Sequence, residues 1–408
     1  MDDSLGSGRG TDGVRPPLMS RALALVFTAS FGAMWSFYLL LSVVPRYATS
    51  HGAGGIGAGG MTGALMGATV AAELAVPRLV GRFGYRSVLA VGLVLLGLPA
   101  LALRAATSLP AIAGICVIRG MGLAVLFVAG SALVPAIAPP ARRAAALGVY
   151  GLVVGVPAVI ALPLGLWLAE RVGYAIVFVL AGGAALGGLA ALPGVPTRTR
   201  AHAGAEAGRG VVAALRSPAL AWPSAVFSLS AMAAGAVVTF LPLAVARGSG
   251  GLAASALFAQ AASTAGARWW AGHHGDRHGS AGLLLPAVLL AAVGLSALTL
   301  VGRPIAVVLG MLVLGAGFGV AQNASLALMF EHAPPRDYDA VSAVWNIAYD
   351  TGLALGGAGF GVLAARTGYP AAFGVAGALV AAALVPAWRD RAWLRPVPDA
   401  PHCPRGYR

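Results

Sequence analysis

Apolar runs of about 20 residues recur along the whole chain and are separated by short turns rich in Gly, Pro and Arg. An α-helix needs a run of this length to cross the hydrocarbon core of a bilayer. Membrane β-strands are about half as long and alternate, whereas these runs are apolar on every face, and unpaired backbone cannot lie in lipid. The pattern therefore predicts an all-α membrane protein with twelve transmembrane helices, at residues 21–45, 60–81, 87–105, 110–137, 143–169, 174–194, 222–246, 252–272, 282–302, 304–330, 340–365 and 369–388.

The chain also resembles itself after a shift of 195 residues. The shift places Ala138-Pro139-Pro140 on Ala333-Pro334-Pro335, Arg82-Phe83-Gly84 on Arg277-His278-Gly279, Gly120 and Gly122 on Gly315 and Gly317, and Tyr150 on Trp345. We therefore expect two pseudo-symmetric bundles of six helices, at residues 21–196 and 221–388. The expected flanking segments are a disordered cytoplasmic leader at 1–20, a cytoplasmic linker at 197–220 and a cytoplasmic tail at 389–408.

The composition fits a membrane location, since 59% of the 408 residues are apolar and only 10% are charged. The net charge of +14 comes from 27 cations, all of them arginine. If the N-terminus is cytoplasmic, 20 of them fall in cytoplasmic segments, counting Arg268 at the end of its span, and six in outer turns. This bias predicts that both termini are cytoplasmic, and it explains the charge without a nucleic-acid partner. We expect a bacterial inner-membrane protein that is a monomer.

The turns after the second and eighth predicted helices resemble the GxxxDRxGRR loop of the major facilitator superfamily. The second copy, GHHGDRHG, keeps Asp276, Arg277 and Gly279, while the first keeps Arg82, Gly84 and Arg86 but has Pro77 at the leading glycine and Gly81 at the acid. The RGMG sequence at Arg119–Gly122 resembles the arginine motif of the fourth helix. The sequence GVYGLVVGVP is loosely similar to the glycine-proline signature of antiporters.

The resemblance implies a secondary active transporter that works by alternating access, and it is strongest to twelve-helix proton-coupled exporters. It also implies roles for the arginine-glycine turns, which would form the cytoplasmic gate loops, with candidate residues Arg78, Arg82, Gly84, Arg86, Asp276, Arg277 and Gly279.

Three charged residues clearly lie within predicted spans, where a charge needs a partner or a function. They are Glu73, Arg119 and Asp350. Glu73 lies about 13 Å up the second helix from Arg82, and Asp350 about 16 Å up the eleventh from Asp339, so their depths agree.

The resemblance implies that the second and eleventh helices are neighbours across the seam between the halves, so that Glu73 and Asp350 either face each other or share a nearby cation. Two close carboxyl groups cannot both ionise cheaply, and such a pair can carry a proton. In the alternative interpretation, Asp350 replaces the acid missing at Gly81 and pairs with Arg78 or Arg82 as a structural latch. Both interpretations fit the sequence.

The resemblance also implies a central substrate cavity lined by helices one, four, seven and ten. Arg119 is the expected ligand contact, with helix-to-helix hydrogen bonding as its alternative. The first helix places three aromatic side chains on one face, and amides occur on the tenth and eleventh helices. Candidate cavity residues are therefore Arg119, Phe31, Trp35, Tyr38, Gln322, Asn323 and Asn346, and together they indicate an amphiphilic, partly aromatic substrate.

The sequence predicts no cofactor and no metal site. HHGDRH, residues 273–278, has histidines at a spacing seen in metal sites, but it lies in a basic turn without a set of acids or cysteines. Cys116 lies in a span and Cys403 in the tail, so no disulfide framework is expected. Enzyme motifs such as HExxH, GxSxG and a phosphate loop are absent, so we expect no enzyme.

We expect a transporter that exports a drug-like or secondary-metabolite compound in exchange for protons, as drug-resistance antiporters do. The abundance of Ala, Gly and Arg without Lys suggests an actinobacterial genome. Two alternatives stay open: proton-coupled uptake of a sugar or organic acid, and a non-transporting membrane sensor or scaffold.

Overall fold

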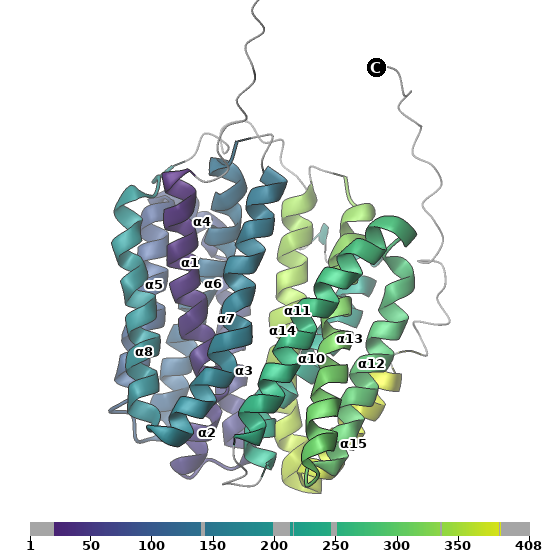
Figure 1. The fold of residues 1–408 in the computed structure, drawn as a ribbon. Coiled ribbons are helices and arrows are strands. Elements are labelled where there is room, and N and C mark those ends of the chain that lie inside the picture. The colour runs from purple at the N-terminus through teal and green to yellow at the C-terminus, as the bar shows by residue number, and fades with distance from the viewer. Residues whose placement is uncertain are drawn as a thin grey trace, which may run out of the picture.

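The computed structural model describes residues 20–139, 143–198, 213–214, 216–245, 251–334, 337–382 and 384. Most of the predicted leader and linker and the whole predicted tail lie outside these residues. Within them the chain is helical, and the helices form two groups that stand side by side (Figure 1).

The first group runs from α1 to η2. Its elements are α1 (Arg21–Leu41), α2 (Val43–Ser50), α3 (Gly55–Glu73), α4 (Val76–Phe83), α5 (Tyr85–Ala102), α6 (Leu109–Ile137), α7 (Arg143–Arg171), α8 (Tyr174–Gly187) and the 3-10 helix η2 (Gly188–Gly194).

The second group runs from α10 to α15. Its elements are α10 (Pro218–Ala244), α11 (Leu252–His278), η4 (Ala281–Leu283), α12 (Leu284–Ala297), η5 (Leu298–Leu300), α13 (Pro304–Glu331), α14 (Tyr338–Thr367) and α15 (Tyr369–Ala382). We call the end of the bundle where η2 ends and α10 begins the linker end, and the opposite end, where α2 lies, the α2 end.

Each of the twelve predicted spans has a helical counterpart. In the described part of the chain, nine helices are long and apolar enough to cross a membrane, or ten if α3 and α4 form one bent span. Two other helices correspond to predicted spans: α11, which ends in the polar sequence GHHGDRH, and α15, which is apolar but only 14 residues long. The observed helices are thus consistent with twelve crossings.

Equivalent contacts recur in the two groups at the offset of 195 residues. Thr69 Oγ1 donates to the carbonyl oxygens of Leu65 and Gly120, at 2.9 and 3.1 Å. Thr264 Oγ1 donates to those of Gln260 and Gly315, at 2.8 and 3.1 Å. The sequence repeat is therefore also a repeat of helix packing.

The glycines of the repeat explain this close packing. A Cβ at Gly120 would overlap the carbonyl oxygen of Leu65, and a Cβ at Gly315 would overlap that of Gln260. Gly84 and Gly279, which end α4 and α11, both have positive φ, 77° and 82°. Glycine adopts such angles without steric cost.

The seam between the two groups is formed mainly by α3 against α14, with α7 against α11 as the second contact. Towards the α2 end, α3 and α14 meet backbone to backbone: a Cβ at Gly59 would overlap the carbonyl oxygen of Gly357. Thr62 Oγ1 and Thr239 Oγ1 of α10 lie 2.9 Å apart beside this contact. Small residues allow helices to approach this closely in a membrane.

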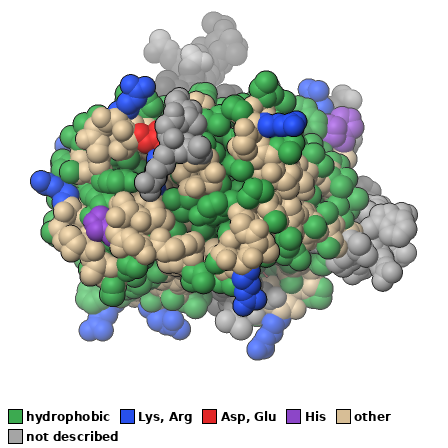
Figure 2. Space-filling view, turned by 90° about the horizontal axis from the view of Figure 1, so that it is seen from below, with side chains coloured by type: hydrophobic (Ala, Val, Ile, Leu, Met, Phe, Trp, Pro, Cys, Tyr) green, Lys and Arg blue, Asp and Glu red, His purple; other side chains and the backbone are tan. Residues whose placement is uncertain are grey.

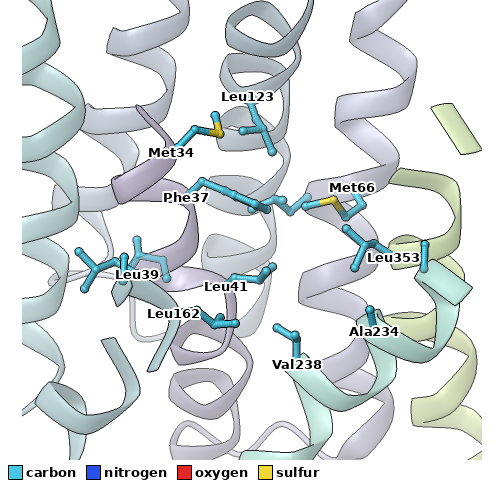
Figure 3. Packing of buried hydrophobic residues seen from close by; sticks show 14 of the residues in the cluster. Met34, Phe37, Leu39, Leu41, Met66, Leu123, Leu162, Ala234, Val238 and Leu353 are labelled. Atoms are coloured by element: carbon cyan, nitrogen blue, oxygen red, sulfur yellow. The ribbon is translucent and has the colours of Figure 1, made fainter. Parts of the chain in front are cut away.

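Apolar side chains fill the part of the seam next to this contact. Met66 of α3 and Leu353 of α14 point toward each other, next to Ala234 and Val238 of α10 (Figure 3). Seen from the α2 end, hydrophobic side chains spread over the middle of the molecule and arginines lie around its edge (Figure 2).

The second predicted span is broken, which the apolar pattern does not show. It consists of α3 and α4, which meet at an angle of 54° across Leu74 and Ala75. Pro77 is the physical cause, because it has no N–H to donate to the carbonyl of Glu73 and its ring clashes with that carbonyl. The equivalent residue in the other half is Gly272, which keeps its N–H, and α11 runs through without a break.

Candidate functional site

Two buried carboxyl groups meet across the seam. Glu73, the last residue of α3, is 5% exposed, and Asp350 of α14 is 1% exposed. The two side chains lie within hydrogen-bonding range of each other. As carboxylates both are acceptors only, and no donor in the described chain reaches either oxygen of Glu73 or Oδ1 of Asp350. A proton on one carboxyl group would supply the missing donor.

A pair of tyrosines lies beside these acids. Tyr38 of α1 and Tyr349 of α14 lie close enough to each other to interact across the seam. Both lie in the electrostatic field of Asp350 and of Arg268 from α11. The cluster therefore combines Glu73, Asp350, Tyr38, Tyr349 and Arg268, from four helices and both halves.

Arg268, which the sequence analysis counted at the end of its predicted span, lies well within α11. It lies ten residues before the end of α11, about 15 Å along the helix axis. Solvent reaches its side chain, although protein surrounds it on most sides.

The arrangement in this conformation is not the predicted latch. One ion pair occurs among the described side chains, between Arg46 and Glu170 near the α2 end, and it lies within one half. Arg78 and Arg82 are exposed on α4, which packs against α5 and α6 of its own half. Neither arginine forms an ion pair with Asp350.

Arg119 lies deep between helices of the N-terminal half. It is 1% exposed, and it donates from Nε to the carbonyl of Leu96 at 3.3 Å and from Nη2 to that of Ser36 at 3.1 Å. These bonds tie α6 to α5 and α1. The position favours the helix-to-helix role over contact with a ligand.

The three aromatic side chains predicted on one face of α1 lie in different surroundings. Phe31 and Trp35 contact each other, with ring centroids 5.6 Å apart; Phe31 is exposed and Trp35 is half-buried. Tyr38 belongs to the seam cluster. Only Tyr38 of the three has a contact that links it to the acids.

A stack of aromatic rings in the C-terminal half was not predicted. Phe227 of α10 is stacked on Trp345 of α14, with centroids 4.6 Å apart and an angle of 9°. Tyr349 lies 5.9 Å from Phe227 and 6.2 Å from Phe318 of α13. Phe227 and Phe318 are buried, whereas Trp345 and Tyr349 are half-buried, so these two form the more accessible edge of the stack.

The predicted amides lie near this stack and near Arg268. Gln322, Asn323 and Asn346 are all half-buried. A Cβ at Gly272, one turn after Arg268, would touch Asn323 Nδ2 at 3.4 Å. Gly319, one turn before Asn323 on α13, packs against the backbone of Arg268. Asn323 and Arg268 are therefore neighbours on adjoining helices.

The residues of the predicted gate loops contact their own halves. Arg86 Nε donates to the carbonyl of Val195 at 2.8 Å, Gly84 packs against Thr197, and Arg82 lies over the ring of Phe83 at 5.2 Å. Arg277 and Gly279 are exposed at the end of α11. The side chain of Asp276 lies outside the described part of the structure.

The histidines of α11 stack on tryptophans and on each other. Trp269 and His273 have centroids 4.5 Å apart, Trp270 and His274 5.0 Å, and His274 and His278 4.4 Å. No group of three or more potential metal ligands occurs among the described residues.

Comparison with known proteins identifies the family. The sequence matches the family model of the Major Facilitator Superfamily over residues 26–357. The chain belongs to this superfamily. It is accordingly a multi-pass membrane transporter rather than an enzyme, as the sequence predicted. None of the curated proteins compared with the chain matches it.

Solved structures of superfamily transporters share the fold. A POT family transporter in complex with a thioalcohol-conjugated peptide has a TM-score of 0.76 at 13% identity, over 92% of this chain and 97% of the other. The nucleoside transporter NupG has a TM-score of 0.68 at 14% identity, over 92% of this chain and 100% of the other. An inward-facing bacterial homolog of the human lysosomal transporter Spinster has a TM-score of 0.74 at 16% identity, over 93% of this chain and 96% of the other.

Proposed function

We propose that this facilitator exports a small amphiphilic, partly aromatic compound in exchange for protons, and that the Glu73–Asp350 pair carries the proton. The observation that supports this proposal is the burial of two facing carboxyl groups without a donor, at the boundary between two halves that must move. Buried polar groups are normally hydrogen-bonded, and an exception calls for an explanation.

The position of the pair suggests how proton and substrate transport are coupled. Glu73 lies at the break of the second span, where α3 leaves the seam and α4 turns towards its own half. If the halves rock about the seam, the surroundings of the pair change at each half-cycle. A proton bound in one conformation is then released in the other, which couples transport to the proton gradient.

Export is favoured over uptake of a sugar or organic acid by the half-buried aromatic side chains of the inner helices. These side chains are Trp35, Tyr38, Trp345 and Tyr349. A sugar site needs a dense set of hydrogen-bonding groups, whereas an amphiphilic compound needs mainly apolar surface.

The test is a comparison of acid-to-amide variants in an efflux-deficient bacterial host. Wild type should raise resistance to at least one compound of a toxic aromatic panel, and Glu73→Gln and Asp350→Asn should abolish that gain at equal protein amounts. Glu170→Gln is the matched control, because this acid lies near the α2 end in an ion pair. Full resistance in the Glu73→Gln strain would contradict the proposal.

Direction and coupling are tested in everted membrane vesicles with an acidic lumen. Addition of the compound should alkalinise the lumen with wild type and leave its pH unchanged with Glu73→Gln. Transport without proton movement would contradict antiport. Downhill release of compound together with protons would instead indicate an uptake permease.

A further inference from the structure

Arg268 has no function in the proton step just described. It lies inside the bundle, in contact with solvent, and no carboxylate among the described residues forms an ion pair with it. The acids of the seam cluster, Glu73 and Asp350, face each other instead, and the groups that interact electrostatically with Arg268 are the hydroxyls of Tyr38 and Tyr349.

An arginine at this depth is costly unless something compensates its charge. Within the repeat, Arg268 occupies the position equivalent to Glu73. Since α11 is unbroken at this point, Arg268 is held on a continuous helix, and its side chain is exposed rather than held in an ion pair with a described residue. A guanidinium in this setting suits a planar anionic group, which it can bind through two parallel hydrogen bonds.

Tyr349, which interacts with Arg268, and Trp345, whose ring lies 6.4 Å from that of Tyr349, match an aromatic compound. Tyr349 and Trp345 form the accessible edge of the aromatic stack, and rings bound there would lie offset or edge-on, as aromatic pairs prefer. Asn323 adds an amide on the adjoining helix.

We propose that Arg268 binds a carboxylate on the substrate and that Trp345 and Tyr349 pack against its ring, so that the exported compound is an aromatic carboxylate. This inference rests on the proposed function, whose substrate class it narrows. It also sets the charge balance of the cycle: exchange of one proton for one monovalent anion moves two elementary charges, whereas exchange for a neutral compound moves one.

Binding to the purified full-length protein tests the carboxylate. The probes are benzoate, 2-naphthoate, indole-3-acetate and anthraquinone-2-carboxylate, each compared with its amide. At least one carboxylate should bind wild type more tightly than its amide. Arg268→Gln should weaken that carboxylate by about 10- to 100-fold, the effect of losing one hydrogen bond to a charged group, and should leave the amide unchanged.

Two variants serve as controls. Arg268→Lys keeps the charge but not the paired hydrogen bonds and should retain part of the preference, and Arg303→Gln, at an exposed arginine between η5 and α13, should retain all of it. The proposal is overturned if no carboxylate binds, if acids and amides bind equally, or if Arg268→Gln keeps the preference.

Glu73→Gln separates this proposal from the proposed function. It should lose proton coupling and keep the carboxylate preference. If proton coupling depends on Glu73 but acids and amides bind equally, only the substrate class is wrong. If Arg268 selects carboxylates but Glu73→Gln stays proton-coupled, only the proton site is wrong.

Discussion

Individual buried charges in this transporter serve different ends. Both oxygens of Glu73 and Oδ1 of Asp350 lack donors, so this conformation leaves polar oxygens uncompensated unless a proton is bound. Arg119 is as deeply buried, but two backbone carbonyls accept its hydrogen bonds. A satisfied buried group stabilises one arrangement, whereas an unsatisfied one favours a change of state. We therefore assign Arg119 to stability and the acids to transport.

This assignment predicts that Arg119→Gln lowers stability without changing binding. The variant loses the charged hydrogen bonds to Leu96 and Ser36, which are worth about 1.5–3 kcal/mol each. The thermal midpoint of the purified protein should fall by several degrees, while the affinity for any bound compound stays within twofold. Arg303→Gln, at an exposed site, should change neither quantity. A loss of affinity with unchanged stability would instead show that Arg119 contacts the substrate.

How much of the site could be predicted depends on the residue. A charge inside an apolar run is visible in the sequence, so Glu73, Arg119 and Asp350 could be identified. Tyr349 could not, because the direction of a neutral side chain depends on packing. Arg268 was visible but misplaced, since the polar sequence that follows it shortens the apolar run, whereas α11 continues to His278.

Whole helices were predicted better than their interruptions. Each hydrophobic run has a helical counterpart in the described part of the chain, because lipid requires a helical run of a certain length. The break of the second span was missed, although Pro77 was visible, because hydropathy measures composition and not the loss of one backbone N–H. At equivalent positions of the repeat, the half with Pro77 has a broken helix and the half with Gly272 has a continuous one.

We expect Pro77→Ala to straighten the second span. The restored N–H can donate to the carbonyl of Glu73, and the ring clash disappears. Spin labels at the exposed positions Ile56 and Phe83 should move apart by roughly 4 Å, from a rise of 1.5 Å per residue. Pro99→Ala, inside α5, is the control and should leave this distance unchanged. An unchanged distance in Pro77→Ala would show that tertiary packing, not proline, bends the span.

At the scale of the whole molecule, two similar halves meet along a seam that differs between its ends. Towards the α2 end, α3 and α14 approach through glycines. Further along α3, the same helix pair carries the carboxyl groups, and beyond Glu73 the chain bends away from the seam. The described contacts between halves therefore concentrate towards the α2 end, which makes the linker end the freer one in this conformation.

A wedge at the glycine contact should separate the halves at the α2 end. Gly59→Leu places a side chain where the carbonyl of Gly357 lies, whereas Gly60→Leu points into open space on the same helix. A cysteine at Thr62, which is buried, should become reactive to a maleimide in the Gly59 variant and stay protected in the Gly60 variant. Equal protection in both would show that the contact does not hold this end closed.

The arginine distribution predicts the orientation in the membrane. Ser50 at the α2 end and Ser87 at the linker end are both exposed. With both termini cytoplasmic, a membrane-impermeant thiol reagent applied to intact cells should label Ser50→Cys and spare Ser87→Cys. Cell lysis should make both react. The reverse labelling would place the termini outside.

The glycine contact between α3 and α14 has one more consequence. Contact between backbones depends on shape and short-range dispersion, which neither ionic strength nor acidity alters appreciably. The equilibrium constant for closure at the α2 end should therefore be the same at low and high ionic strength and from mildly acidic to mildly alkaline pH. Any dependence of the transport rate on pH must then arise elsewhere along the boundary between the halves. The glycine contact itself contains no group that titrates.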